Sequence, residues 1–80
     1  MRILDVEGDK SLSEIALYLT RPEANELMDS LEQLLADPNP NSRHEHVTSS
    51  DYKNEITVCI YDPENLEGFD DRSKRLITED

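Results

Sequence analysis

The sequence predicts an α+β protein in which a four-stranded antiparallel sheet, in the order β-β-α-β-β, carries one amphipathic helix on one face. Three observations support this fold class. A capped segment in the middle of the chain repeats apolar residues at helical spacing, and short segments before and after it alternate apolar and polar residues. The chain has only 80 residues, so one helix over one face of a sheet accounts for the whole pattern.

The helix is expected from about Arg21 to Ala36. Thr20 and Glu23 have the spacing of a capping box, and Pro22 lies in the first turn, where its missing amide hydrogen costs nothing. The segment 37–41, Asp-Pro-Asn-Pro-Asn, ends the helix because proline cannot continue it. Apolar residues at three-four spacing predict the face turned to the sheet: Ala24, Leu27, Met28, Leu31, Leu34 and Leu35.

Two pairs of strands are expected around this helix. Leu4 and Val6 indicate a weak first strand, and the alternation over residues 15–20 indicates a stronger second one, with residues 8–11 joining them. After the helix, residues 43–49 predict a polar strand and residues 55–61 a strong one. Together these segments predict four antiparallel strands in one sheet.

Two registers of the second hairpin stay open. With a turn at Tyr52-Lys53, His46 faces Cys59; with a turn two residues longer, His44 faces Cys59 and His46 faces Thr57. Either register places His44, His46 and Cys59 on the sheet face away from the helix, because side chains alternate along a strand. These three residue types are chemically competent zinc ligands, although the sequence offers no recognisable fourth.

The domain organisation follows from the same pattern. Residues 1–61 are expected to form a single α+β domain. Residues 62–80 are expected to form an acidic C-terminal segment, either a short helix around residues 71–77 or a partly disordered tail.

Charge is the most informative part of the composition. Nineteen acidic against eight basic residues give a net charge of −11, of which residues 1–61 carry 12 acids and 5 bases. This balance argues against direct binding to nucleic acid or to an anionic membrane, since both need Lys and Arg. One cysteine, no apolar segment long enough to span a bilayer and no pattern of a signal peptide predict a cytoplasmic protein.

Two surfaces are candidates for binding. The outer face of the predicted helix carries Glu26, Asp29 and Glu32, and residues 21–37 have a net charge of −4, which suits a basic protein partner. The sheet face away from the helix is expected to present two tyrosines and three small residues among polar groups: Tyr18, Tyr61, Ala16, Thr57 and Cys59. Tyrosine-containing faces of this kind are typical of interfaces, so a homodimer through the open sheet face is a further hypothesis.

Part of the pattern resembles a known group of proteins. Residues 17–27, Leu-Tyr-Leu-Thr-Arg-Pro-Glu-Ala-Asn-Glu-Leu, are followed by the leucine-rich helix, then by His-Glu-His-Val at 44–47 and Glu-Ile-Thr-Val-Cys-Ile-Tyr at 55–61. Over roughly residues 14–61 this resembles small bacterial immunity proteins of polymorphic-toxin systems and their uncharacterised relatives. The resemblance implies a protein that neutralises a toxin by binding it, and assigns no role to individual residues.

The sequence therefore favours a non-enzymatic, acidic protein-interaction module, with no catalytic constellation and no cofactor. The two glycines, Gly8 and Gly68, cannot build a phosphate-binding loop. Two alternatives remain: a zinc-binding protein that uses His44, His46 and Cys59, and a nucleic-acid mimic whose carboxylates imitate phosphates.

Overall fold

The computed structural model describes residues 1–41 and 43–78, which group into two compact units. One unit comprises residues 1–17 with the C-terminal residues from 68 onward, and the other comprises residues 18–67. This grouping does not follow the boundary expected at residue 61, and whether residues 1–61 fold as one domain stays a prediction. None of the described helices is long and apolar enough to cross a membrane.

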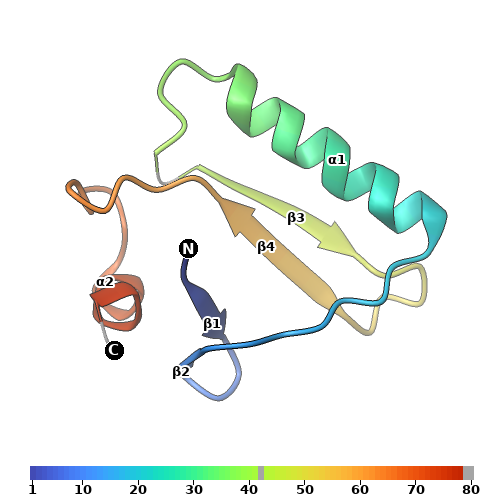
Figure 1. The fold of residues 1–80 in the computed structure, drawn as a ribbon, viewed down its shortest axis with the longest axis horizontal. Helices are drawn as coiled ribbons and strands as arrows, with labels where there is room; N and C mark the ends of the chain where they lie inside the picture. The colour runs from blue at the N-terminus through green and yellow to red at the C-terminus, as the bar shows by residue number, and fades with distance from the viewer. Residues whose placement is uncertain (42, 79–80) are drawn as a thin grey trace. The chain divides into compact units, whose positions relative to one another are not determined.

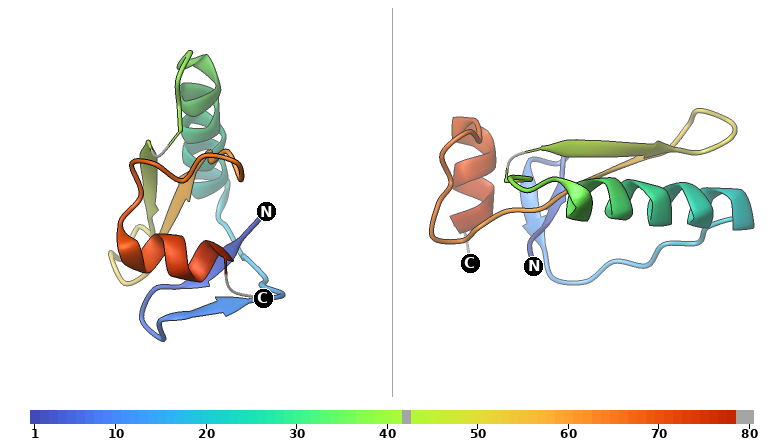
Figure 2. Two further views of the ribbon diagram at one scale, coloured as in Figure 1. Left: turned by 90° about the vertical axis from the view of Figure 1, so that its left-hand side faces the viewer. Right: turned by 90° about the horizontal axis from the view of Figure 1, so that it is seen from above.

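The unit of residues 18–67 consists of one helix packed on one hairpin. Helix α1 (Arg21–Ala36) runs alongside the antiparallel strands β3 (His44–Thr48) and β4 (Glu55–Cys59), as two views of the ribbon show (Figure 1, Figure 2). The predicted helix bounds are confirmed, and both strands lie within their predicted ranges. The core of this unit is small: Leu34 is completely buried and Val47 is 4% exposed.

The capping box predicted at the start of α1 is present. The Thr20 hydroxyl accepts from the Glu23 amide, and the Glu23 carboxylate accepts from the Thr20 amide at 2.8 Å. The same carboxylate accepts from the Ser50 amide at 3.3 Å, in the turn that joins the two strands. These hydrogen bonds, led by the one from the Thr20 backbone, hold the pKa of Glu23 below its ordinary value.

The β3–β4 hairpin takes the longer of the two predicted turns. His44 pairs with Cys59, His46 with Thr57 and Val47 with Ile56. Side chains inside the turn stabilise this choice: Asp51 accepts from the Ser49 hydroxyl and from the Lys53 amide, and the Ser49 hydroxyl accepts from the Asn54 amide. Tyr52, within this turn, has a φ of 61°, an uncommon left-handed conformation for a residue other than glycine.

The other unit contains a short hairpin and a short helix. Strand β1 (Ile3–Asp5) pairs with β2 (Lys10–Leu12), and helix α2 (Asp71–Thr78) contributes Leu76 and Ile77 to a small core with Phe69. The Ser11 hydroxyl donates to the Leu76 carbonyl at 2.7 Å. A helix near residues 71–77 was one of the two expectations for the C-terminal segment; Glu79 and Asp80 lie outside the described residues.

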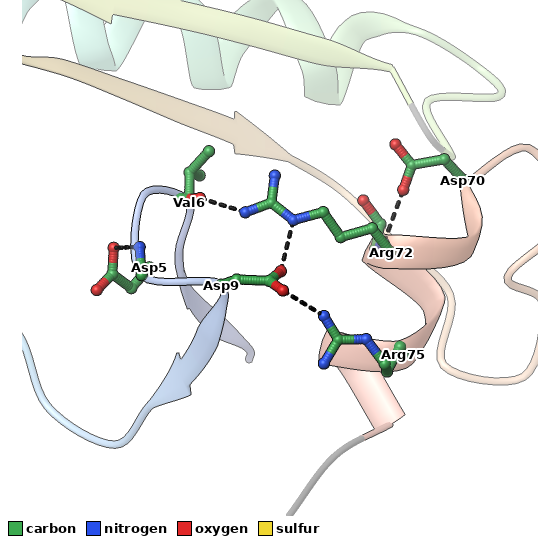
Figure 3. Close-up of polar contacts among 8 residues, drawn as sticks. Asp5, Val6, Asp9, Asp70, Arg72 and Arg75 are labelled. Carbon is green, nitrogen blue, oxygen red and sulfur yellow. Dashed lines mark hydrogen bonds and ion pairs between the residues drawn. The ribbon is translucent and has the colours of Figure 1, made fainter.

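A carboxylate joins the hairpin of this unit to α2. Asp9 accepts from Arg72 at 2.6 Å and from Arg75 at 2.8 Å, and Arg72 also donates to the Val6 carbonyl (Figure 3). The hydrogen bond from Arg72 is the largest influence that holds the pKa of Asp9 below its ordinary value. Asp9 is left-handed with a φ of 55°, so the turn between β1 and β2 presents it to both arginines.

The predicted four-stranded sheet is wrong, because the described residues form two separate two-stranded sheets. The second strand lies at Lys10–Leu12 and not at residues 15–20, which have no strand partner. The turn after β1 explains the difference: the Gly8 amide donates to the Asp5 carboxylate, which brings the chain back into register at Lys10. Residues 15–20 alternate as a strand does, but no backbone edge pairs with them.

Neighbouring leucines of α1 provide a test of this packing. We expect Leu34→Ala to lower the free energy of unfolding by about 2–5 kcal/mol, because it leaves a cavity in the core. Leu35 is 75% exposed, so Leu35→Ala changes the free energy of unfolding by no more than about 0.5 kcal/mol. Urea unfolding followed by far-ultraviolet circular dichroism measures both; similar losses for the two variants would contradict the packing.

The capping box provides a pH-dependent test. The folded pKa of Glu23 lies below its ordinary value of 4.5, so the stability that its carboxylate contributes is present above pH 4.5. This contribution is lost as the pH falls through the folded pKa. A carboxyl-carbon NMR titration should give a lowered pKa for Glu23 in the wild type. Thr20→Ala should return this pKa only part of the way toward 4.5, because alanine lacks the hydroxyl but keeps the backbone amide, whose hydrogen bond is the largest influence. A wild-type pKa of 4.5 or above would contradict the capping hydrogen bonds.

Candidate functional site

The acidic face of α1 consists of Glu26, Asp29 and Glu32, which are all exposed. They follow one another at intervals of three residues, and they point away from the hairpin because Leu27 and Leu34 occupy the side turned toward it. No described residue forms an ion pair with any of the three. The last turn of α1 contains no basic residue.

Elsewhere in the chain, three arginines have carboxylate partners. Arg43 bridges Asp37 at 3.0 Å and Glu45 at 2.9 Å, between the end of α1 and β3. Arg72 and Arg75 share Asp9 in the other unit. The described ion pairs thus neutralise carboxylates away from the acidic face, and the charge of that face remains exposed.

The structure also places an apolar stripe on α1 that sequence reasoning assigned to the core. The stripe consists of four exposed residues: Ala24, Met28, Leu31 and Leu35. Met28 is 52% exposed and Leu31 42% exposed, in contrast to the buried Leu34. A two-stranded hairpin is narrower than the predicted sheet and covers only part of the apolar side of the helix. The sequence signal that could have identified the stripe is the 24-28-31-35 spacing, which places these four residues on a different side of the helix from Leu34.

The face of the hairpin away from α1 carries the two histidines and the cysteine. His44 lies directly opposite Cys59, and His46 is 2.9 Å from both the Thr57 hydroxyl and the Glu55 carboxylate through Nδ1. Within residues 1–41 and 43–78, no three His, Cys, Asp or Glu side chains are grouped closely enough to hold a metal ion. The structure therefore places His44, His46 and Cys59 on one face without forming the predicted ligand set.

Cys59 is not arranged as a reactive thiol. It is only partly exposed, and burial raises the pKa of the thiol above its ordinary value of 9.0. A raised pKa leaves very little thiolate at neutral pH, and the thiolate is the form that attacks electrophiles and binds metals. This environment fits a packing residue better than a nucleophile.

The two tyrosines of the predicted sheet face do not share a strand or a sheet. Tyr18 is 95% exposed in the segment that leads into α1, whereas Tyr61 is half-buried two residues after β4. The expected open face of a four-stranded sheet is therefore not formed. Tyr18 remains a strongly exposed aromatic side chain two residues before the first residue of the capping box.

No protein-family model, curated protein or solved structure matches this chain.

The environment of Cys59 leads to a test of its reactivity. At pH 7.5 we expect Cys59 to react with a thiol-specific disulfide reagent more slowly than a cysteine in a short unstructured peptide, because its pKa is raised and access is limited. Unfolding in urea should bring the rate to that of the peptide. A folded protein that reacts faster than the peptide would indicate an activated thiolate and would contradict this assignment.

Proposed function

We propose that this protein is a non-enzymatic interaction module that binds a basic protein through the acidic face of α1. The observation that carries the proposal is the exposed row of Glu26, Asp29 and Glu32, which forms no ion pair with any described residue. Like charges three residues apart on a helix cost a little stability. A positively charged partner would relieve this repulsion, and the relief would add to the binding free energy.

Charge complementarity also favours rapid encounter. A net charge of −11 on 80 residues produces a negative field that attracts a basic protein from beyond contact distance. Salt screens exposed charges over about 8 Å at physiological ionic strength, so binding through this face should weaken as salt rises. Tyr18, exposed next to the start of α1, extends the proposed surface with an aromatic side chain.

The class of partner follows from the resemblance of residues 14–61 to bacterial immunity proteins. An immunity protein acts by binding, and a basic toxin would suit the charge of α1. Within this proposal the protein works in the cytoplasm and needs no metal, cofactor, nucleic acid or membrane. The zinc-binding alternative receives no support from the positions of His44, His46 and Cys59.

A pair of charge-matched variants tests the proposal. The helix variant Glu26→Gln, Asp29→Asn, Glu32→Gln and the control variant Glu7→Gln, Glu14→Gln, Glu64→Gln each remove three exposed carboxylates, and so change the net charge equally. We expect affinity capture from the native host at low salt to recover a basic protein with the wild type and the control. The helix variant should bind that protein at least about tenfold more weakly.

The outcomes of this experiment are distinct. Equal weakening by both variants would show that only the total charge matters and would overturn the assignment to α1. Recovery of no basic protein at low salt would overturn the function itself. If duplex DNA competes with the chain for the captured protein, the nucleic-acid mimic is favoured, because the partner then uses one site for both.

A further inference from the structure

The apolar stripe of α1 lies between the side covered by the hairpin and the acidic face. With about 100° of rotation per residue, the order around the helix is Leu34 and Leu27, then the stripe, then Glu32 and Asp29. Leu35 is 75% exposed and Met28 52% exposed, so the stripe contacts little within the chain. One helix side therefore presents a continuous apolar surface with an acidic border.

The spacing of the stripe matches another helix. Its members, Ala24, Met28, Leu31 and Leu35, are separated by four, three and four residues, the repeat that places side chains along the seam between two packed helices. The stripe is about 16 Å long at 1.5 Å per residue, which is three turns of a partner helix. An amphipathic helix docked on an apolar groove is a recurrent mode of recognition.

The acidic border selects among possible helices. Glu32 and Asp29 lie where the flanking residues of a docked helix would reach, and neither has an ion-pair partner among the described residues. A second copy of this chain would bring a second net charge of −11 and the same carboxylates against them. A helix flanked by Lys or Arg would neutralise them and cover the stripe with its own apolar residues.

We propose that the apolar stripe of α1 binds a basic amphipathic helix of another protein, with Glu32 and Asp29 pairing to its flanking Lys or Arg side chains. This inference rests on the proposed function, since it names the element of the basic partner that α1 recognises. Apolar burial supplies the affinity and the acidic border supplies the selection, so both parts of the surface are required.

Three designed peptides of about 18 residues, five helical turns, test this docking mode. The first is helical, with Leu at the seam positions and Lys at the flanks. The second has the same composition in scrambled order, and the third keeps the Leu seam with Glu in place of Lys. Fluorescence anisotropy with the full chain at about 50 mM salt should detect binding of the first peptide, at least about tenfold tighter than either control.

Variants of the chain locate the binding surface. Met28→Ser and Leu35→Ser should each weaken binding of the first peptide about tenfold or more. Ile15→Ser is the matched control, because Ile15 is 49% exposed but lies outside α1. Circular dichroism checks that each variant keeps the wild-type fold, which the exposure of these side chains leads us to expect.

Failure of this inference is distinguishable from failure of the proposed function. If the scrambled peptide binds as tightly as the first, and only the acidic-face variant of the chain weakens this binding, helix docking is overturned. The proposed function, binding of a basic protein, is then retained. Equal binding of the Glu-flanked peptide, or no binding of the first, also overturns helix docking. Sedimentation that shows a wild-type dimer dispersed by Leu35→Ser would assign the stripe to a second copy and overturn it as well.

Discussion

The contact of α1 with the β3–β4 hairpin is the constraint on which the unit of residues 18–67 depends. Leu34 is completely buried and Val47 nearly so, and the larger unit has no other buried apolar side chain among the described residues. A core this small has two consequences. It leaves stability sensitive to one leucine, and it leaves most of the apolar side of α1 uncovered. The small contact between α1 and the hairpin therefore accounts both for the small core and for the exposed apolar stripe.

Local hydrogen bonds compensate for the small core at the edges of the elements. The Glu23 carboxylate caps α1 and also accepts from Ser50 in the hairpin turn, so one side chain links the start of the helix to the turn of the hairpin. Arg43 performs a similar role at the opposite end, where it joins Asp37 to Glu45. Such exposed contacts contribute little individually, but they define where the helix and hairpin meet.

The carboxylates of the described residues fall into two groups, those that have a partner among these residues and those that do not. Asp9, Asp37 and Glu23 have hydrogen-bond or ion-pair partners that lower their pKa values, and each holds two parts of the chain together. Glu26, Asp29 and Glu32 have no such partner among the described residues, and they line the one helix with an exposed apolar stripe. An acidic border beside an apolar stripe is the basis of both proposals, because each component alone is common on protein surfaces.

The sequence by itself determined the helix, its two ends, its cap and the two strands of the second hairpin. These features depend on residues a few positions apart, such as Thr20 with Glu23, whose hydrogen bonds lie within the first turn of the helix. It also determined the charge of the outer helix face. It left two registers for the hairpin, and the side chains of Ser49 and Asp51 within the turn selected the longer turn.

Only the tertiary structure decided which apolar side chains are covered and which strands pair. The alternation over residues 15–20 predicts a strand, but it does not say which other strand would pair with it. In the structure Lys10–Leu12 pairs with β1 instead. Leu34 and Leu35 are chemically identical neighbours, yet one is buried and the other exposed, because the width of the hairpin sets how much of α1 it covers. The width of the hairpin, the pairing of the strands and the burial of the helix side chains all depend on contacts between segments distant in sequence. No local sequence pattern encodes such contacts.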